Sequence, residues 1–210
     1  MNFINQFFIL IFPVLSALTI HEFSHGLIAY RLGDDTAKRA GRLTLNPLKH
    51  LDPIGTIMLF IAHIGWAKPV PINPYNFKDM KRDTALVSLA GPAANFITAA
   101  VVSIFFRLIN PTPAMFNTNI LVQILFYTIF INLALGIFNL IPFPPLDGSK
   151  ILGAFLSDEY YYKFQRFERQ GMMIFLIIIV GSRLLNLNII GGIIMPPVFF
   201  FLKLFTGLQF

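Results

Sequence analysis

Long apolar stretches, separated by two more polar regions, dominate this chain. A membrane-spanning helix needs about 20 predominantly apolar residues, and several stretches approach that length. The pattern predicts spans at about 3–30, 84–108, 119–141, 172–185 and 189–210. Residues 150–170, in contrast, are polar and amphipathic. We therefore expect one domain over 1–210, an all-α polytopic membrane protein with about five transmembrane helices.

The region 31–83 interrupts this pattern. It is rich in Pro, Gly and Asn, and Gly41–Leu45 alternates between polar and apolar residues as a strand does. The stretch Ile54–Trp66 is apolar but too short to cross a bilayer comfortably. The sequence thus predicts a membrane-associated or re-entrant β element between the first and second spans.

Composition and charge support a membrane protein. Of the 210 residues 56% are hydrophobic and 12% are charged, whereas soluble domains carry about 25% charged residues. The net charge of +6 could indicate nucleic-acid binding, but the basic residues flank apolar stretches. They fall mainly in 31–83 and 142–171, so the positive-inside rule places both regions in the cytoplasm and the N-terminus outside. We expect no nucleic-acid partner, and we take the first apolar stretch as a retained span and not as a signal peptide.

One motif with chemical meaning lies inside the first span. His21-Glu22-Phe23-Ser24-His25 is an HExxH sequence, which on a helix places two imidazoles one turn apart on the same face. Two such rings can hold one zinc ion, with the adjacent glutamate acting on a water. Ionisable residues are costly at membrane depth, so this cluster indicates a functional site. Simple helix packing by the two histidines is the alternative.

A catalytic zinc site needs a third protein ligand. With no cysteine in the chain, the ligand must be His, Asp or Glu. His50 and His63 are candidates, but Asp147, in a Pro-rich turn after the 119–141 span and before Gly148, is the best one. It could also cap a following helix. The remaining carboxylates lie in polar runs and are expected at solvated surface: Asp34, Asp35, Asp52, Asp79, Asp83, Asp158, Glu159 and Glu168.

These residues define a catalytic hypothesis. Glu22 is the candidate general base, which takes a proton from the attacking water and passes it to the leaving amine. Asn139, eight residues before Asp147, is a candidate donor to the oxyanion of the intermediate. Its alternative role is to cap its own helix. Zinc, one ion per chain, is the expected metal, although iron, cobalt or manganese can also occupy a His₂-carboxylate site.

Three motifs in order resemble the site-2 protease family of intramembrane zinc metalloproteases: His21–His25, Ala90–Asn95 and Asn139–Gly148. The resemblance implies His21, His25 and Asp147 as zinc ligands, Glu22 as catalytic base and Asn139 near the substrate carbonyl. It also implies a membrane-associated β element over Gly41–Pro74. The chain is similar to the minimal, core-only members without a PDZ or CBS domain.

The expected function is therefore an intramembrane zinc endopeptidase that cleaves peptide bonds in or near transmembrane segments. Its expected partners are a transmembrane protein substrate and the lipid bilayer. The site is expected near the cytoplasmic face, in the plasma membrane of a prokaryote. Two other classes remain open, because HExxH plus a carboxylate does not specify the scissile bond: a membrane zinc hydrolase with another substrate, and a non-catalytic metal-binding membrane protein.

Overall fold

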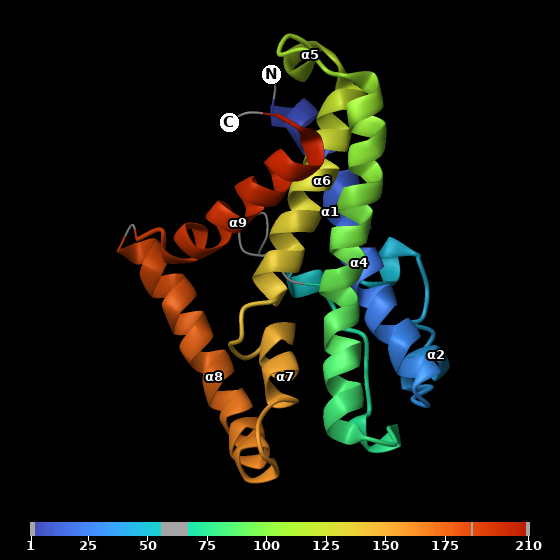
Figure 1. Cartoon of the computed structure of the whole chain (residues 1–210), viewed down its shortest axis with the longest axis vertical. Coiled ribbons are helices and arrows are strands. Elements are labelled where there is room, and N and C mark those ends of the chain that lie inside the picture. Colours follow the sequence, from blue (N-terminus) through green and yellow to red (C-terminus); the bar gives the residue numbers. More distant parts are fainter. Residues whose placement is uncertain (1–2, 56–66, 186, 209–210) are drawn as a thin grey trace.

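The computed structural model describes residues 3–55, 67–185 and 187–208, and these residues form helices joined by turns and extended segments (Figure 1). The longer helices are α1 (Phe3–Arg31), α4 (Met80–Ile109), α6 (Ile120–Asn139), α8 (Asp158–Leu184) and α9 (Ile189–Thr206). The shorter ones are α2 (Thr36–Arg39), η1 (Pro47–Lys49), η2 (Pro74–Asn76), α5 (Met115–Thr118) and α7 (Asp147–Gly153).

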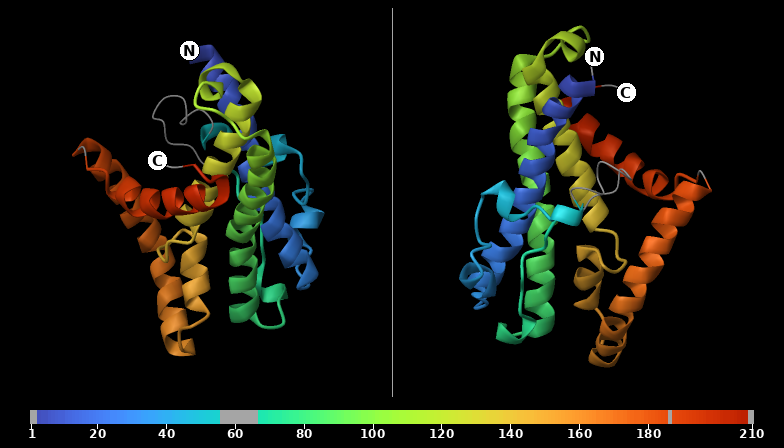
Figure 2. Two further views of the ribbon diagram at one scale, coloured as in Figure 1. Left: turned by 45° about the horizontal axis from the view of Figure 1, so that its top comes forward. Right: turned by 180° about the vertical axis from the view of Figure 1, so that it is seen from behind.

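Helices α1, α4 and α6 run side by side and form the bundle that carries the site (Figures 1 and 2). Polar caps define where two of them begin. Asp79 accepts a hydrogen bond from the Arg82 N–H at the start of α4, and Asn119 accepts from the Leu121 and Val122 N–H groups at the start of α6. Such caps satisfy N–H groups that have no partner within the helix.

Helix α9 closes one side of the bundle through an apolar core. Val198 and Leu202 of α9 pack against Ile129 and Leu133 of α6 and Phe106 of α4, all fully buried. In Figure 1, α9 leans across the upper part of α6. The buried residues of this core come from α4, α6 and α9, so the core holds α4 and α6 together.

Helix α8 extends away from the bundle. Figure 1 shows it diverging at lower left, with α7 between it and α4. Its anchors are aromatic: Phe175 lies against Phe138 of α6, and Phe167 meets Phe143 in the turn after α6, with ring centroids 5.9 Å and 6.4 Å apart. The turn that delivers Asp147 is therefore held between α6 and α8.

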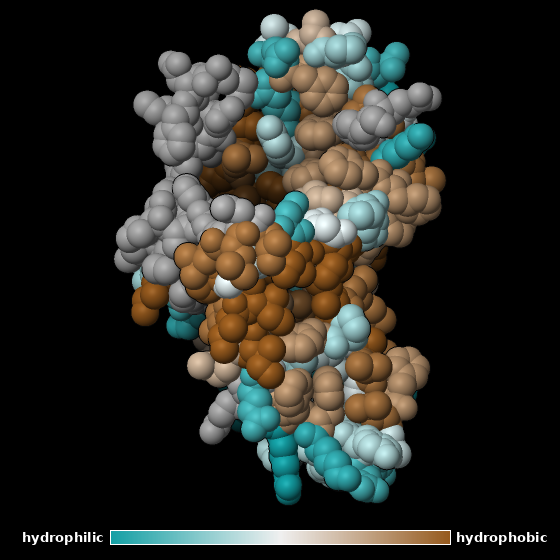
Figure 3. Space-filling view, turned by 90° about the vertical axis from the view of Figure 1, so that its left-hand side faces the viewer, coloured by the Kyte–Doolittle hydropathy of each residue, from teal (hydrophilic) through white to brown (hydrophobic). Residues whose placement is uncertain are grey.

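The all-α polytopic class is confirmed, but the expected number of spans is corrected. Within the described residues, four helices are long and apolar enough to cross a membrane: Ile9–Arg31, Met80–Ile109, Ile120–Asn139 and Ile189–Thr206. The predicted span at 172–185 belongs to α8. The apolar part of α8, Gln170–Ser182, is shorter than the four candidate spans. The first half of α8 is polar, so α8 joins two segments that the pattern had separated. Figure 3 shows apolar side chains across the middle of one face and hydrophilic ones at its lower end.

The predicted β element is wrong for the described residues. Gly41–Leu45 forms a turn and bends, and pairing is limited to one isolated antiparallel bridge between Leu51 and Ala67. Side chains replace strand partners here: the His50 Nε2–H donates to the Thr44 carbonyl, and Asn46 caps η1, which ends the short alternation. Part of the Ile54–Trp66 stretch, residues 56–66, lies outside the described residues.

Candidate metal centre

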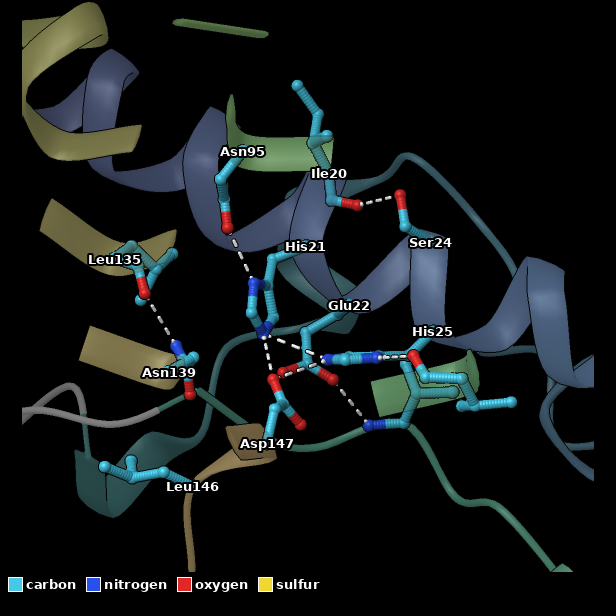
Figure 4. A network of polar contacts seen from close by, with 12 residues as sticks. Ile20, His21, Glu22, Ser24, His25, Asn95, Leu135, Asn139, Leu146 and Asp147 are labelled. Atoms are coloured by element: carbon cyan, nitrogen blue, oxygen red, sulfur yellow. Dashed lines mark hydrogen bonds and ion pairs between the residues drawn. The ribbon is translucent and has the colours of Figure 1, made fainter. Parts of the chain in front are cut away.

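The two histidines of the HExxH motif face the middle of the bundle from α1 (Figure 4). Their spacing of four residues places them on one helix face. The rings meet edge to face with centroids 4.6 Å apart, and their Nε2 atoms are 3.0 Å apart. Both residues are buried, His21 at 4% and His25 at 6% exposure. The sequence thus provides two adjacent nitrogen ligands away from bulk solvent.

Asp147 completes the group from a different part of the chain. It is the first residue of α7, and its Oδ2 lies 3.1 Å from His21 Nε2 and 3.2 Å from His25 Nε2. The next residue must be a glycine, because a Cβ at Gly148 would lie 2.3 Å from the Leu140 carbonyl oxygen. This close packing places the Asp147 carboxylate against the two histidines of α1.

A glycine on α4 makes room for both rings. A Cβ at Gly91 would lie 2.5 Å from His25 Nε2 and 2.7 Å from His21 Cε1, far inside normal contact distances of about 3.5–4.0 Å. Helix α4 can therefore approach the imidazoles only because residue 91 has no side chain. Gly91 belongs to the Ala90–Asn95 motif, so the close helix packing at this motif directly shapes the site.

The outer nitrogen of each ring contacts an oxygen on α4. His25 Nδ1 lies 2.7 Å from the Val87 carbonyl oxygen, and His21 Nδ1 lies 2.6 Å from Asn95 Oδ1. Oxygens of this kind accept hydrogen bonds, so each Nδ1 carries the ring hydrogen and each neutral ring has its lone pair on Nε2. The two Nε2 atoms and Asp147 Oδ2 then face one another as three acceptors.

This donor set fits a metal ion. Three electron-rich atoms facing one another in a buried site repel unless a cation lies between them. In a tetrahedral zinc site with bonds of about 2.0–2.1 Å, ligand atoms lie about 3.3 Å apart. The three separations here are 3.0, 3.1 and 3.2 Å. Among the residues that the structure describes, His21, His25 and Asp147 form the group able to hold a metal ion in this way.

Glu22 lies beside this group and is held by the backbone. Its Oε2 accepts a 2.8 Å hydrogen bond from the Val70 N–H (Figure 4). The extended segment around Val70 is fixed in turn, because the Arg42 guanidinium donates to the Lys68 carbonyl oxygen at 2.7 Å. Sequence reasoning did not find this contact, since a backbone N–H leaves no signature in the sequence.

Asn139 lies at the end of α6, close to Asp147 (Figure 4). Its amide nitrogen donates a 3.0 Å hydrogen bond to the Leu135 carbonyl oxygen in its own helix. An amide has two N–H groups, so this bond uses one of them. The structure therefore brings Asn139 to the site, and its catalytic role stays a prediction.

The other candidate ligands lie elsewhere or cannot be placed. His50 is 2% exposed and contacts the Thr44 carbonyl, outside the group of His21, His25 and Asp147. His63 lies outside the described residues. Asp34 and Asp83 are also buried, at 0% and 5% exposure, contrary to the expectation of solvated surface.

Comparisons with known proteins identify the family of this chain. A sequence model of peptidase family M50 matches residues 108–182. A Bacillus subtilis protein named "Putative zinc metalloprotease YwhC" is 41% identical over 175 residues, which cover 81% of this chain and 80% of that protein. A Mycolicibacterium smegmatis protein with the same description, Rip2, is 31% identical over 189 residues, covering 88% and 71%.

A more distant relative is the Methanocaldococcus jannaschii protein named "Zinc metalloprotease MJ0392", 30% identical over 159 residues that cover 74% of this chain and 35% of that protein. No solved structure matches the chain. Two relatives above 30% identity align over more than two thirds of both lengths. The four apolar helices agree with a multi-pass membrane protein. The chain therefore belongs to peptidase family M50, the site-2 protease family.

Proposed function

We propose that this chain is an intramembrane zinc endopeptidase that hydrolyses peptide bonds in or near transmembrane segments of other membrane proteins. The observation that carries the proposal is the convergence of His21 Nε2, His25 Nε2 and Asp147 Oδ2 within 3.2 Å of one another, beside Glu22. One zinc ion per chain is assigned to these three atoms. The names of the relatives, which are called zinc metalloproteases, support both the metal and the reaction class.

The residues around the metal have separate tasks. When bound, zinc supplies Lewis acidity and lowers the pKa of a coordinated water. Glu22 takes the proton of the attacking water and delivers it to the nitrogen of the leaving amine. The Val70 N–H holds the Glu22 carboxylate through Oε2, and we assign Oε1 to the proton transfer.

Asn139 is assigned to the substrate carbonyl. Its amide nitrogen keeps one N–H after donating to Leu135, and it lies at the same end of α6 from which Asp147 is reached. An N–H held in place before the reaction stabilises the negative charge that develops on the carbonyl oxygen. The substrate segment must be locally unwound, because the carbonyls of an intact helix are occupied by intrahelical hydrogen bonds.

The depth of the site suits a substrate held in the bilayer. His25 lies within the candidate span Ile9–Arg31, a few residues before its basic end, and α7 follows the end of the span Ile120–Asn139. The positive-inside rule assigns these two ends to the cytoplasm and the N-terminus to the outside. The proposed site is thus in the membrane near its cytoplasmic face, which in a prokaryote is the plasma membrane.

The test combines proteolysis with metal analysis. Zinc-loaded protein in liposomes is given a model transmembrane substrate, and the wild type is compared with Glu22→Gln and Asp147→Asn. Glu159→Gln is the matched control, because Glu159 is exposed and pairs with Lys163 on α8. We expect Glu22→Gln to keep zinc and to lose about 10²–10⁴-fold in rate. We expect Asp147→Asn to lose both zinc and activity, and the control to match the wild type.

Two results would overturn the proposal. If zinc-loaded wild type cleaves no peptide across a panel of transmembrane substrates, and Glu22→Gln behaves like the wild type in every assay, the protein is a metal-binding membrane protein without proteolysis. If instead it hydrolyses lipid-linked substrates and spares peptides, it is a zinc hydrolase of another class.

A further inference from the structure

A chain of hydrogen bonds leads from the metal centre into the bundle and ends on α6. Asn95 Oδ1 lies 2.6 Å from His21 Nδ1. The Asn95 amide nitrogen donates to the Ala17 carbonyl at 3.1 Å and to Asn132 Oδ1 at 2.9 Å. The Asn132 amide nitrogen donates to the Thr128 carbonyl at 2.8 Å. Both asparagines are fully buried, so the chain links α1, α4 and α6 away from solvent.

The backbone carbonyls at the ends of this chain fix the orientation of both amides. The Thr128 carbonyl can only accept, so the end of Asn132 that faces it must be the NH₂ group. Asn132 then presents its oxygen to Asn95. The end of Asn95 that faces this oxygen and the Ala17 carbonyl must also be NH₂.

The orientation of Asn95 determines the tautomer of His21, the proposed zinc ligand. With its NH₂ group committed, Asn95 can offer only its oxygen to His21. The ring hydrogen of His21 therefore stays on Nδ1, and Nε2 keeps the lone pair that faces Asp147 Oδ2 at 3.1 Å. The other tautomer would place a hydrogen on Nε2, where it would block metal binding.

We propose that Asn132, which contacts no ligand atom, is a positioning residue for metal binding: together with the Ala17 carbonyl it holds the Asn95 amide in the orientation that keeps His21 in the tautomer able to coordinate. This inference rests on the metal site of the proposed function but not on proteolysis. A purely structural role is the competing explanation, because an asparagine pair can also hold two membrane helices together. The experiment must separate zinc affinity from helix packing.

The primary variant is Asn132→Leu, which removes the amide while keeping similar volume. Zinc affinity is measured by chelator competition on purified protein in micelles, together with thermal unfolding of the metal-free protein. Removing the direct partner of a metal-binding histidine typically costs about 10–100-fold in metal affinity. We expect the zinc Kd of Asn132→Leu to rise by about 10-fold, at the lower end of that range, because the Ala17 carbonyl still holds one hydrogen of Asn95. The matched control is Ser103→Ala on α4, which removes a buried hydroxyl and its bond to the Ala100 carbonyl outside this hydrogen-bond chain. It should leave the zinc Kd unchanged.

A double substitution tests the mechanism directly. In an Asn95→Asp background, both side-chain oxygens accept hydrogen bonds, so His21 keeps its hydrogen on Nδ1 whichever way the carboxylate turns. This background loses the donors to Ala17 and Asn132, so its own zinc Kd is the reference for the double variant. Adding Asn132→Leu to that background should therefore cost no zinc affinity. Asn132→Leu should lower zinc affinity only where residue 95 is an asparagine, whose side chain has an oxygen at one end and an NH₂ group at the other.

The outcomes are distinct. An unchanged zinc Kd in Asn132→Leu overturns the inference, even if the metal-free protein is less stable. An equal rise in Kd in both backgrounds also overturns it, because the effect would not pass through the orientation of Asn95. Asn132→Ala replaces Asn132→Leu if the latter does not fold. A protein that binds zinc in this pattern but cleaves nothing leaves the inference standing and removes only the proposed proteolysis.

Discussion

Two carboxylates near the C-terminal half of α1, the fully buried Asp34 and the largely buried Asp147, have opposite surroundings. Asp34, just beyond the end of α1, is surrounded by donors. Its oxygens accept hydrogen bonds from the Thr36 N–H and hydroxyl, the Asn73 N–H and the Asn76 amide. We call these four residues the Asp34 cluster. Burial opposes ionisation of Asp34, but these hydrogen bonds outweigh it and lower the pKa of the carboxyl.

Asp147 has the reverse environment. Its Oδ2 faces the Nε2 atoms of His21 and His25, and the hydrogens of both rings are committed to oxygens on α4. A buried acceptor that is satisfied by N–H and O–H groups joins parts of the fold, as the Asp34 cluster joins the end of α1 to η2. A buried acceptor that faces other acceptors requires a cation. The difference separates a structural carboxylate from the proposed metal ligand without reference to sequence motifs.

The largest effect should come from closing the space at the metal centre. Gly91→Ala would place a methyl group where His21 and His25 now lie, with contacts of 2.5–2.7 Å. The rings must move apart, so we expect zinc affinity to fall about 100-fold or more and proteolysis to be lost with it. Metal content after purification and chelator competition measure the effect.

The control for this substitution is Gly181→Ala on α8, where a Cβ would meet nothing within 4 Å. It should leave zinc binding unchanged and should favour the helix slightly. If Gly91→Ala binds zinc as tightly as the wild type, the rings do not have the arrangement described here.

Removing zinc should weaken the fold at the metal centre by an intermediate amount. A ligand present at a thousandfold excess over its Kd stabilises the folded state by about 4 kcal/mol. We therefore expect chelation to lower the unfolding temperature of the wild type and to abolish proteolysis, with both restored by added zinc. In Asp147→Asn the unfolding temperature should not respond to zinc. A response equal to that of the wild type would place the metal elsewhere.

Local rules explain why the proposed ligands could be predicted from the sequence. The positions of His21 and His25 follow from helix periodicity alone, and Gly148 marks a close approach of backbone that aims Asp147. The partners of these residues could not be predicted in the same way. The Val87 carbonyl and the Val70 N–H are backbone groups of distant segments, and such groups have no residue-type signal.

Contacts between segments far apart in the sequence explain why parts of the fold were predicted wrongly. Gly41–Leu45 alternates over too few residues to require a partner strand, and hydrogen bonds from Arg42 and His50 to distant or local carbonyls hold it as an irregular segment. The burial of Asp34 depends on η2, about forty residues later, coming back to the end of α1. Nothing in the sequence distinguishes Asn132 within the predicted 119–141 span, because its proposed role depends on the packing of three helices.

The smallest effect is expected at the Asp34 cluster, and it should be confined to stability. In Asp34→Asn one oxygen becomes an NH₂ group, which must face a donor such as the Asn73 N–H. Leaving buried donors unpaired costs about 1–3 kcal/mol. We expect unfolding at pH 7 to occur at lower temperature, with zinc Kd unchanged. A changed zinc Kd would show that the Asp34 cluster and the metal centre are coupled, so that Asp34 would not be a purely structural carboxylate.

The stabilisation that Asp34 contributes should also depend on pH in a defined direction. Because the pKa of Asp34 is lower in the folded chain than in the unfolded one, the unfolded chain binds this proton first as the pH falls. The stabilisation is therefore complete above the unfolded pKa of about 4 and is lost below it. The difference in stability between wild type and Asp34→Asn should be constant from pH 5 to 8 and should shrink below pH 4, about where the unfolded carboxyl titrates. A difference that instead changes between pH 5 and 8 would mean that a histidine, and not this carboxylate, controls the cluster.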